Sequence, residues 1–294
     1  MNNRPVNVSN VDANKIKFVV GPSKEGRNPS ISLKYENGQN LEVMVPKLAF
    51  PGGVNTRVDP ATKKVSYTMM GTLKDCDPYA VERCTANTEV AAFYNLLLDL
   101  ERLIVDNAVE NSVKWFGKKR SREAVLDGWK RILGVSSTKE DGMYVPNGKY
   151  PPSLRIKIPV YDDSVKTDVV DSQRNDLYVT PDSLTSIFPK GVVCNVVLGA
   201  SIYIMSGGGF GVTWRLQHAQ TLPSTKLTAA DIFAVEDVEY EEDAVATLTP
   251  SQETGVVDSA GGVVERPTTP DDQPIQPGGV PAAPARKRRT AVTQ

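Results

Sequence analysis

Basic side chains stand beside apolar or aromatic ones in several short, strand-like stretches of the sequence. In SLRIKIPV (153–160) the side chains of Arg155 and Lys157 fall on one face of a strand, and in GFGVTWRLQHAQ (209–220) Trp214 precedes Arg215. Sequence-tolerant binding of a single-stranded nucleic acid needs cations for the phosphates and aromatic rings for the bases. We therefore predict that these strands contact a nucleic acid. Similar pairings elsewhere add Lys17, Lys34, Tyr35, Lys149 and Tyr150 to the candidate contacts. The basic cluster KWFGKKRSR (114–122) adds Lys118, Lys119 and Arg120.

Three consecutive glycines at 207–209 precede the strand that carries Trp214 and Arg215. A phosphate loop would need the pattern GxxxxGK[ST] followed by a helix, but a strand pattern follows here, and GMYVPNGKY (142–150) has one residue too many between its glycines. We therefore predict a hairpin turn. Because neighbouring strand residues point to opposite faces, we expect Arg215 at the groove and Trp214 in the core, sharing its face with Val212, Leu216 and His218. The alternative is that Trp214 is core and Arg215 is merely solvated. Trp214 is also kept among the candidate DNA contacts.

Catalysis finds little support in the residue types. The single histidine, His218, cannot form a two-histidine zinc site, and no pair of carboxylates stands out. The three cysteines form no CxxC motif, although Cys76 and Cys84 are an alternative pair of metal ligands. We expect no enzymatic activity, no cofactor, no metal site and reduced cysteines in an intracellular setting. No run of about 18 apolar residues and no signal peptide are found, so we expect a soluble protein without a membrane partner.

The spacing of apolar residues predicts the elements that must position these side chains. Alternation predicts strands at 15–20, 30–35, 41–46, 63–71, 153–160, 191–206 and 209–220, with weaker strands within 168–180. Asn37 and Gly38 predict a hairpin turn. A helical period predicts a helix at 87–112, with Asn87 or Thr88 as its N-cap. It predicts a second helix at 121–133 that ends at Gly134, and a third at 180–188.

These elements indicate a mainly β (α+β) fold. Strands on both sides of a two-helix insertion, at about 85–135, favour a small closed or partly closed barrel, with a sandwich as the alternative. We expect a flexible N-terminus over 1–13 and a body over 14–230. Residues 231–294 are rich in Pro, Gly and acidic residues and hold few bulky apolar groups, so we expect them to be disordered.

Charge is distributed unevenly along the chain. Residues 231–294 hold 12 Asp and Glu and 5 Lys and Arg, a net charge of −7, which leaves +6 on residues 1–230. A basic body suits a polyanionic partner, and the acidic stretch EDVEYEED (236–243) suits regulation of that contact or recruitment of other proteins.

Three blocks of the sequence, NPSISLKYENGQNLEVMVPKLAFPGGV (28–54), GKYPPSLRIKIPV (148–160) and GFGVTWRLQHAQ (209–220), carry a resemblance to a known family. They resemble the single-stranded-DNA-binding proteins of large eukaryotic DNA viruses, which include African swine fever virus, algal and amoebal virus members. More distantly, the chain resembles phage single-stranded-DNA-binding proteins with an OB-fold and an acidic tail. The resemblance implies an elaborated OB-fold with 209–220 as a late barrel strand, and it adds Lys47 and Arg57 to the residues around the groove.

We therefore expect a non-catalytic protein that coats and protects single-stranded DNA in viral DNA replication, recombination or repair. RNA is the alternative ligand, and the further partners are replication proteins bound through 236–243 and other copies of the chain. A structural or virion-assembly protein is the second hypothesis and an enzyme the third. The expected location is the host cytoplasm or viral factory, the nucleus or the virion, with Arg286–Arg289 as a nuclear signal or a second DNA contact.

Overall fold

The computed structural model describes residues 4–22, 28–36 and 38–222, which all belong to one compact unit, Met1–Asp237. Strands dominate these residues, as the sequence predicts. The segment 231–294, with its acidic stretch and its basic end, lies outside the described residues.

Five strands close into a barrel. In order around it they are β4 (Glu42–Phe50), β6 (Val65–Thr72), β11 (Ser153–Ile158), β17 (Phe210–Thr221) and β16 (Val192–Ile204), and β16 pairs in turn with β4. All neighbours are antiparallel except β11 and β17, which are parallel. Counted along the chain, this order is 1-2-3-5-4-1, the topology of an OB-fold. The predicted barrel is confirmed, and closure excludes the sandwich.

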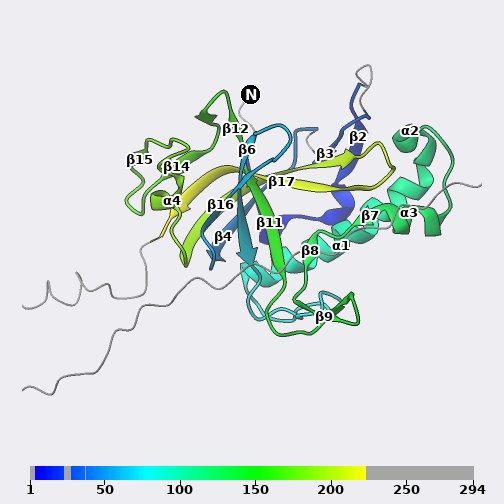
Figure 1. Ribbon diagram of the computed structural model, residues 1–294, viewed down its shortest axis with the longest axis horizontal. Helices are drawn as coiled ribbons and strands as arrows, with labels where there is room; N and C mark the ends of the chain where they lie inside the picture. The colour runs from blue at the N-terminus through cyan, green and yellow to red at the C-terminus, as the bar shows by residue number, and fades with distance from the viewer. Residues whose placement is uncertain (1–3, 23–27, 37, 223–294) are drawn as a thin grey trace, which may run out of the picture. The chain divides into compact units, whose positions relative to one another are not determined.

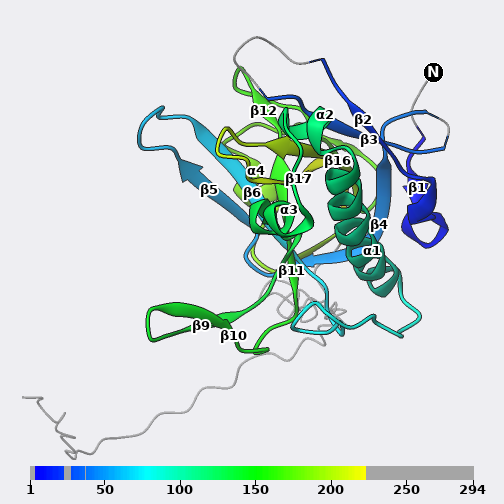
Figure 2. The same cartoon turned by 90° about the vertical axis from the view of Figure 1, so that its right-hand side faces the viewer.

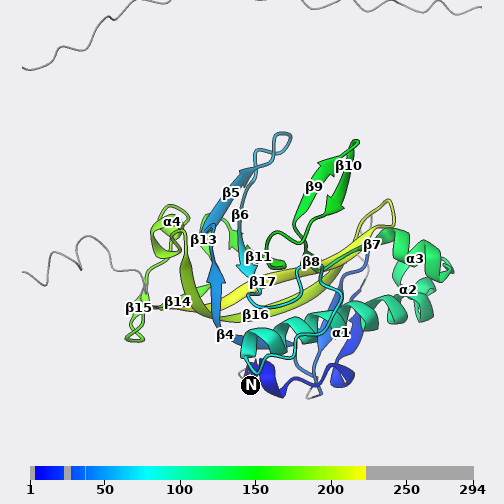
Figure 3. The same cartoon turned by 90° about the horizontal axis from the view of Figure 1, so that it is seen from below.

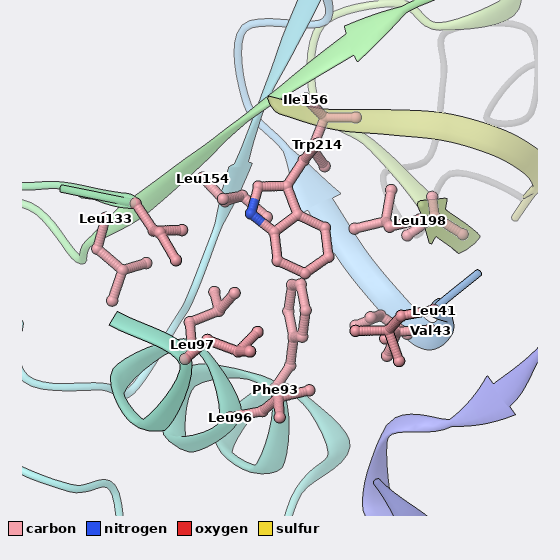
Figure 4. Packing of buried hydrophobic residues seen from close by; sticks show 14 of the residues in the cluster. Leu41, Val43, Phe93, Leu96, Leu97, Leu133, Leu154, Ile156, Leu198 and Trp214 are labelled. Carbon is pink, nitrogen blue, oxygen red and sulfur yellow. The ribbon is translucent and has the colours of Figure 1, made fainter. Parts of the chain in front are cut away.

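One long helix packs its apolar face against the barrel. Helix α1 (Glu89–Glu110) begins where the Thr88 hydroxyl accepts a hydrogen bond from the Ala91 N–H at 3.1 Å, so Thr88 rather than Asn87 is the N-cap. The ring of Phe93 meets the ring of Trp214 edge to face at 5.8 Å (Figure 4). In Figure 1 the helix runs beneath the barrel strands. None of the helices in the described part of the chain combines the length and apolar character needed to cross a membrane.

Further strands extend or flank the barrel. β2 (Lys17–Val20) and β3 (Ile31–Lys34) continue the sheet beyond β16, and β14 (Asp168–Val170) and β15 (Asp176–Leu177) continue it beyond β17. Two hairpins that the sequence did not reveal, β5 (Val54–Val58) with β6 and β9 (Ser137–Glu140) with β10 (Met143–Pro146), project from the same side of the barrel (Figures 2 and 3). A small β12 (Val160–Tyr161)–β13 (Ser164–Val165) hairpin and helix α4 (Leu184–Ile187) complete this region.

The prediction of a helix over 121–133 is wrong for its second half. After α2 (Ser112–Phe116), helix α3 covers only Arg122–Gly128, and β7 (Trp129–Lys130) and β8 (Leu133–Gly134) follow, paired with β17 and β11. The Ile132 N–H donates to Glu101 Oε1 at 2.6 Å instead of continuing a helix. Pairing with the parts of β17 and β11 that do not pair with each other, and a carboxylate on α1, outweigh the local helical period.

Residues 4–13, expected to be part of a flexible N-terminus, pack on the barrel instead. β1 (Val6–Asn7) pairs in parallel with β4, and the short 3-10 helices Val8–Asn10 and Ala13–Lys15 follow. Val8 is buried, which explains why this polar-looking segment is ordered. Gly38 has a φ of +77°, as the predicted turn requires, and the turn is joined by the Lys34–Asn40 bridge and by backbone hydrogen bonds from Tyr35 to Gln39 at 2.9 Å and from Leu41 to Leu33 at 2.8 Å.

Candidate nucleic-acid interface

The outer faces of β11 and β17 present a row of cations. Along β11 the buried Leu154, Ile156 and Ile158 alternate with exposed Arg155 and Lys157, as the sequence predicts. Lys157 is the register partner of Arg215 on β17. Because residues opposite one another on paired strands share a face, the Arg215 side chain lies on the same outer surface as Lys157.

A hollow of about 330 Å³ lies over this face. Its lining residues come from β6, β11, β16 and β17, and no carboxylate is among them: Ser66, Thr68, Arg155, Lys157, Tyr203, Val212, Thr213 and Trp214. A second hollow of about 220 Å³ shares Ser66 and Lys157 with the first and reaches Tyr67 and Tyr161. We refer to the two adjoining hollows as the β6–β11 groove. The groove thus has a cationic floor with a tyrosine towards either end.

The cations on this outer face, of which Arg155 and Lys157 line the groove and Arg215 lies opposite Lys157, are largely unneutralised. Within residues 4–22, 28–36 and 38–222, no carboxylate oxygen lies within 4.0 Å of a side-chain nitrogen of Arg155, Lys157 or Arg215. Arg215 Nη1 donates to Ser201 Oγ at 2.6 Å, which orients the guanidinium without cancelling its charge.

One acidic residue, Asp59, lines the far end of the groove. Its carboxylate accepts hydrogen bonds from the backbone N–H groups of Thr62 at 3.0 Å and Ala61 at 2.8 Å, in the turn between β5 and β6. These bonds hold the pKa of Asp59 below its usual value of 3.8, and the bond from Thr62 has the largest effect. Its role is therefore to order the turn.

Three predicted contact residues lie on or shortly after the two projecting hairpins. Arg57 on β5 is exposed and is the register partner of Ser66, which lines both hollows. Lys149 and Tyr150 follow the β9–β10 hairpin directly, with Lys149 Nζ 5.3 Å from the centroid of the Tyr150 ring. The Tyr150 side chain is exposed, so its other face is free to stack.

Tyr203 is a candidate contact that our reading of the sequence missed. It lies opposite Gly211 across β16 and β17, and a Cβ at Gly211 would come within 2.8 Å of the Tyr203 hydroxyl. The missing side chain at Gly211 therefore lets the phenol ring lie across β17 beside the cations. Alternation along 191–206 puts Tyr203 on the face of Ser201, but without the strand pairing nothing in the sequence joins it to Arg155. Other lining residues missed for the same reason are Ser66, Thr68, Tyr161 and Thr213.

Two aromatic residues predicted as DNA contacts are instead part of the core. Tyr35 is 8% exposed, and its hydroxyl accepts a hydrogen bond from the Asp12 N–H at 3.1 Å. Trp214 borders the first hollow but is only 2% exposed, and its indole Nε1 has no hydrogen-bond partner among the described residues. Neither ring has a face open to a base, so both are excluded from the candidate interface, and the expected division between Trp214 in the core and Arg215 outside holds.

The expectation that His218 shares the core face of Trp214 is wrong. The pairing of β16 with β17 shifts between Val197 and Leu198, so that Gln217 is the extra residue of a bulge. One extra residue reverses the alternation that follows, which turns the imidazole outward. His218 Nδ1 lies 3.1 Å from Asp168 Oδ2 on β14, and the His218 side chain is 53% exposed.

The remaining predicted cations do not line the groove. Lys17 and Lys34 are register partners on β2 and β3, and Lys47 is exposed on β4, where its N–H donates to Asn195 Oδ1 at 3.0 Å. Lys118 and Lys119 are exposed between α2 and α3.

Arg120 has a structural position. Its Nη1 donates to the Gly208 carbonyl at 3.0 Å, and its guanidinium carbon lies 4.2 Å from the centroid of the Phe116 ring. The triple glycine forms the predicted hairpin turn, closed by the Met205 N–H to Gly209 carbonyl bond at 2.8 Å. Arg120 therefore ties this turn to the helices.

No family profile and no curated protein matches this sequence. Among solved structures, the single-stranded DNA binding protein gp2.5 encoded by bacteriophage T7 is similar at a TM-score of 0.37 and 13% identity, over 70% of this chain and 98% of that one. The C-terminally truncated single-stranded DNA-binding protein from bacteriophage Enc34 is similar at a TM-score of 0.36 and 11% identity, over 70% and 96% of the two chains. At these values neither similarity establishes a family for the chain.

Proposed function

We propose that this protein binds single-stranded DNA in the β6–β11 groove, without catalysing a reaction. The observation that carries the proposal is the row of Arg155, Lys157 and Arg215 on the outer face of an OB-fold barrel, with no carboxylate pairing them among the described residues. Exposed cations repel one another, and a phosphate backbone relieves that repulsion.

The side chains around the cations favour a single strand over a duplex. Tyr203 lines the first hollow of the groove and Tyr161 the second, and Tyr150, shortly after the β9–β10 hairpin, is exposed. A tyrosine ring stacks on an unpaired base for about 1–3 kcal/mol, a contact that a duplex with stacked, paired bases does not offer. The hydroxyls of Ser66, Thr68 and Thr213 add hydrogen-bond partners for phosphate or sugar oxygens.

The proposal extends to a biological role that the groove by itself leaves open. Coating and protecting single strands during viral DNA replication, recombination or repair is supported by the sequence resemblance described above. A non-sequence-specific groove suits such a role, because stacking and phosphate contacts tolerate any sequence.

The test is a titration of the full-length chain against a fluorescently labelled dT oligomer, followed by anisotropy. Tryptophan emission is a poor reporter, since Trp115 and Trp214 are buried. We expect binding at 50 mM salt, and we expect unlabelled single strand to compete strongly and duplex only weakly. The logarithm of the binding constant should fall with the logarithm of the salt concentration, with a slope of roughly −2 to −3 for three or four phosphate contacts. An RNA oligomer of equal length measures the preference for DNA. Absence of binding at 50 mM salt, or equal competition by duplex, would contradict the proposal and favour the structural or virion-assembly hypothesis.

A further inference from the structure

Two cysteines that the groove does not use lie together between β6 and α1. Cys76 is buried in the turn after β6, and Cys84 is half-buried in the segment that leads into α1. The Cys84 thiol donates to the carbonyl of Asp75, the neighbour of Cys76, at 3.3 Å. The side chain of Cys84 is also one cause of the raised pKa of the Cys76 thiol. The third cysteine, Cys194, is fully buried inside the barrel on β16.

The chain between the two cysteines is already held in a closed loop. The Asp77 carboxylate accepts hydrogen bonds from the N–H groups of Tyr79, Val81 and Glu82 at 2.8–3.1 Å. Asn95 on α1 binds the backbone of Cys84 from both sides, accepting from its N–H at 3.0 Å and donating to its carbonyl at 2.8 Å. These bonds hold Cys84 beside the backbone that leads into Cys76, where its thiol meets the Asp75 carbonyl.

We propose that Cys76 and Cys84 are a thiol–disulfide site, which a low-molecular-weight disulfide such as oxidised glutathione converts to an intramolecular disulfide. The Cys84 thiolate, as the more accessible sulfur, attacks one glutathione sulfur; an S–S bond forms, the glutathione S–S bond breaks, and one reduced glutathione leaves. The Cys76 thiolate then attacks Cys84 Sγ and expels the second glutathione. In total, two protein thiols are oxidised by two electrons, one glutathione disulfide is reduced, and the two protons pass to the two glutathione thiols.

The second step has a built-in pH dependence. Burial, followed by the contact with Cys84, raises the pKa of the Cys76 thiol to about 12. Below that pH the thiolate fraction of Cys76 rises about tenfold per pH unit, and ring closure accelerates with it. Ring closure is therefore slow near neutral pH and faster in alkali.

The disulfide would stiffen the foot of the β9–β10 hairpin. Tyr79 lies in the loop between the cysteines, and a Cβ on Gly148 would come within 2.7 Å of the Tyr79 hydroxyl, so that the ring packs at the foot of the β9–β10 hairpin. Closing the loop covalently fixes Tyr79, and with it the base of a hairpin beside Lys149 and Tyr150.

The experiment uses the full-length chain with Cys194→Ala, so that only the pair can react. The protein is incubated with oxidised glutathione at pH 7, 8 and 9, alkylated in denaturant and analysed by mass spectrometry. We expect its mass to fall by two hydrogens. We also expect to detect one pair of peptides joined by a disulfide between Cys76 and Cys84. The rate should rise several-fold per pH unit, dithiothreitol should reverse the change, and the oxidised form should unfold ~5–10 °C higher.

Two control variants make the result decisive. Cys84→Ser in the same background should stay monomeric and unmodified, and Cys76→Ser should stop at a glutathione adduct on Cys84. A stable glutathione adduct in the intact pair, a disulfide-linked dimer, or no thiol loss at pH 9 would overturn the proposal. The measurement involves no nucleic acid, so its outcome is independent of the proposed DNA binding.

Discussion

Lys157 on β11 and Arg215 on β17 are register partners across the parallel strand pair that closes the barrel. Like charges placed directly opposite one another on a sheet destabilise it, by a few tenths of a kcal/mol up to about 1 kcal/mol. The barrel thus keeps two cations side by side at a cost to its own stability, an arrangement that suits an anionic ligand.

Replacing one member of this pair should separate binding from stability. We expect Lys157→Ala to weaken binding of a dT oligomer and to reduce the salt slope by about 0.7, while the free energy of unfolding in urea stays level or rises slightly. Lys47→Ala is the matched control, since it removes the same charge from an exposed position beside Asn195 and outside the groove. Equal losses for both variants would show that net charge rather than the groove determines binding.

Tyr203 should contribute through its ring. Tyr203→Ala is expected to weaken single-strand binding ~5- to 100-fold, because one stacked base is lost, whereas Tyr203→Phe retains the ring and most of the affinity. Tyr178→Ala is the control, as that side chain is 90% exposed and lies outside the groove. Anisotropy titrations at one salt concentration measure all three. If the alanine and phenylalanine variants bind alike, Tyr203 does not stack.

Trp214 should matter for folding and not for binding. Its ring is buried against Phe93, so Trp214→Ala should cost about 3–5 kcal/mol of unfolding free energy in a urea titration. The milder Trp214→Phe should fold and bind DNA within about twofold of the wild type, since no ligand reaches the indole. A large loss of affinity in a stably folded Trp214→Phe variant would return Trp214 to the interface.

The triple glycine offers a pair of neighbouring substitutions with opposite expectations. Gly208 has a φ of +83°, and an added Cβ would collide with the Arg120 guanidinium, whereas a Cβ on Gly207 meets nothing within 4 Å. We expect Gly208→Ala to cost about 1–3 kcal/mol of stability and Gly207→Ala to change it by less than about 0.5 kcal/mol. Thermal and urea unfolding measure the stability of each variant relative to the wild type. Equal effects would mean that the turn is not held by Arg120.

The loop between Cys76 and Cys84 should be sensitive to acid through Asp77. Hydrogen bonds from backbone N–H groups hold the pKa of Asp77 below 3.8 in the folded protein, and the bond from Glu82 has the largest effect. A carboxyl with a lowered folded pKa stabilises fully above its unfolded pKa, and this contribution disappears as the pH falls through the folded value. The free energy of unfolding in urea should therefore be higher for the wild type than for Asp77→Asn at pH 6. The difference between the two should be smaller at pH 3. A gap that is independent of pH would exclude the charge as the cause.

Some of this protein follows from the sequence alone, because it depends on neighbours along the chain. Alternation in 153–160 suffices to put Arg155 and Lys157 on the surface and Ile156 inside, since strand side chains must point to opposite faces. The helical period and Thr88 likewise locate α1. The strand that follows the three glycines is enough to identify a hairpin turn.

The rest depends on contacts between residues distant in sequence, which only the tertiary structure decides. Barrel closure brings β11 beside β17 and so makes one surface of Lys157, Arg215 and Tyr203. One bulge at Gln217 turns His218 outward although the local pattern puts it inside. Residues 129–130 and 133–134 become strands because the parts of β17 and β11 that do not pair with each other offer their backbone groups partners. Periodicity records which face a residue occupies, but register and pairing, which determine what that face meets, are set by the whole fold.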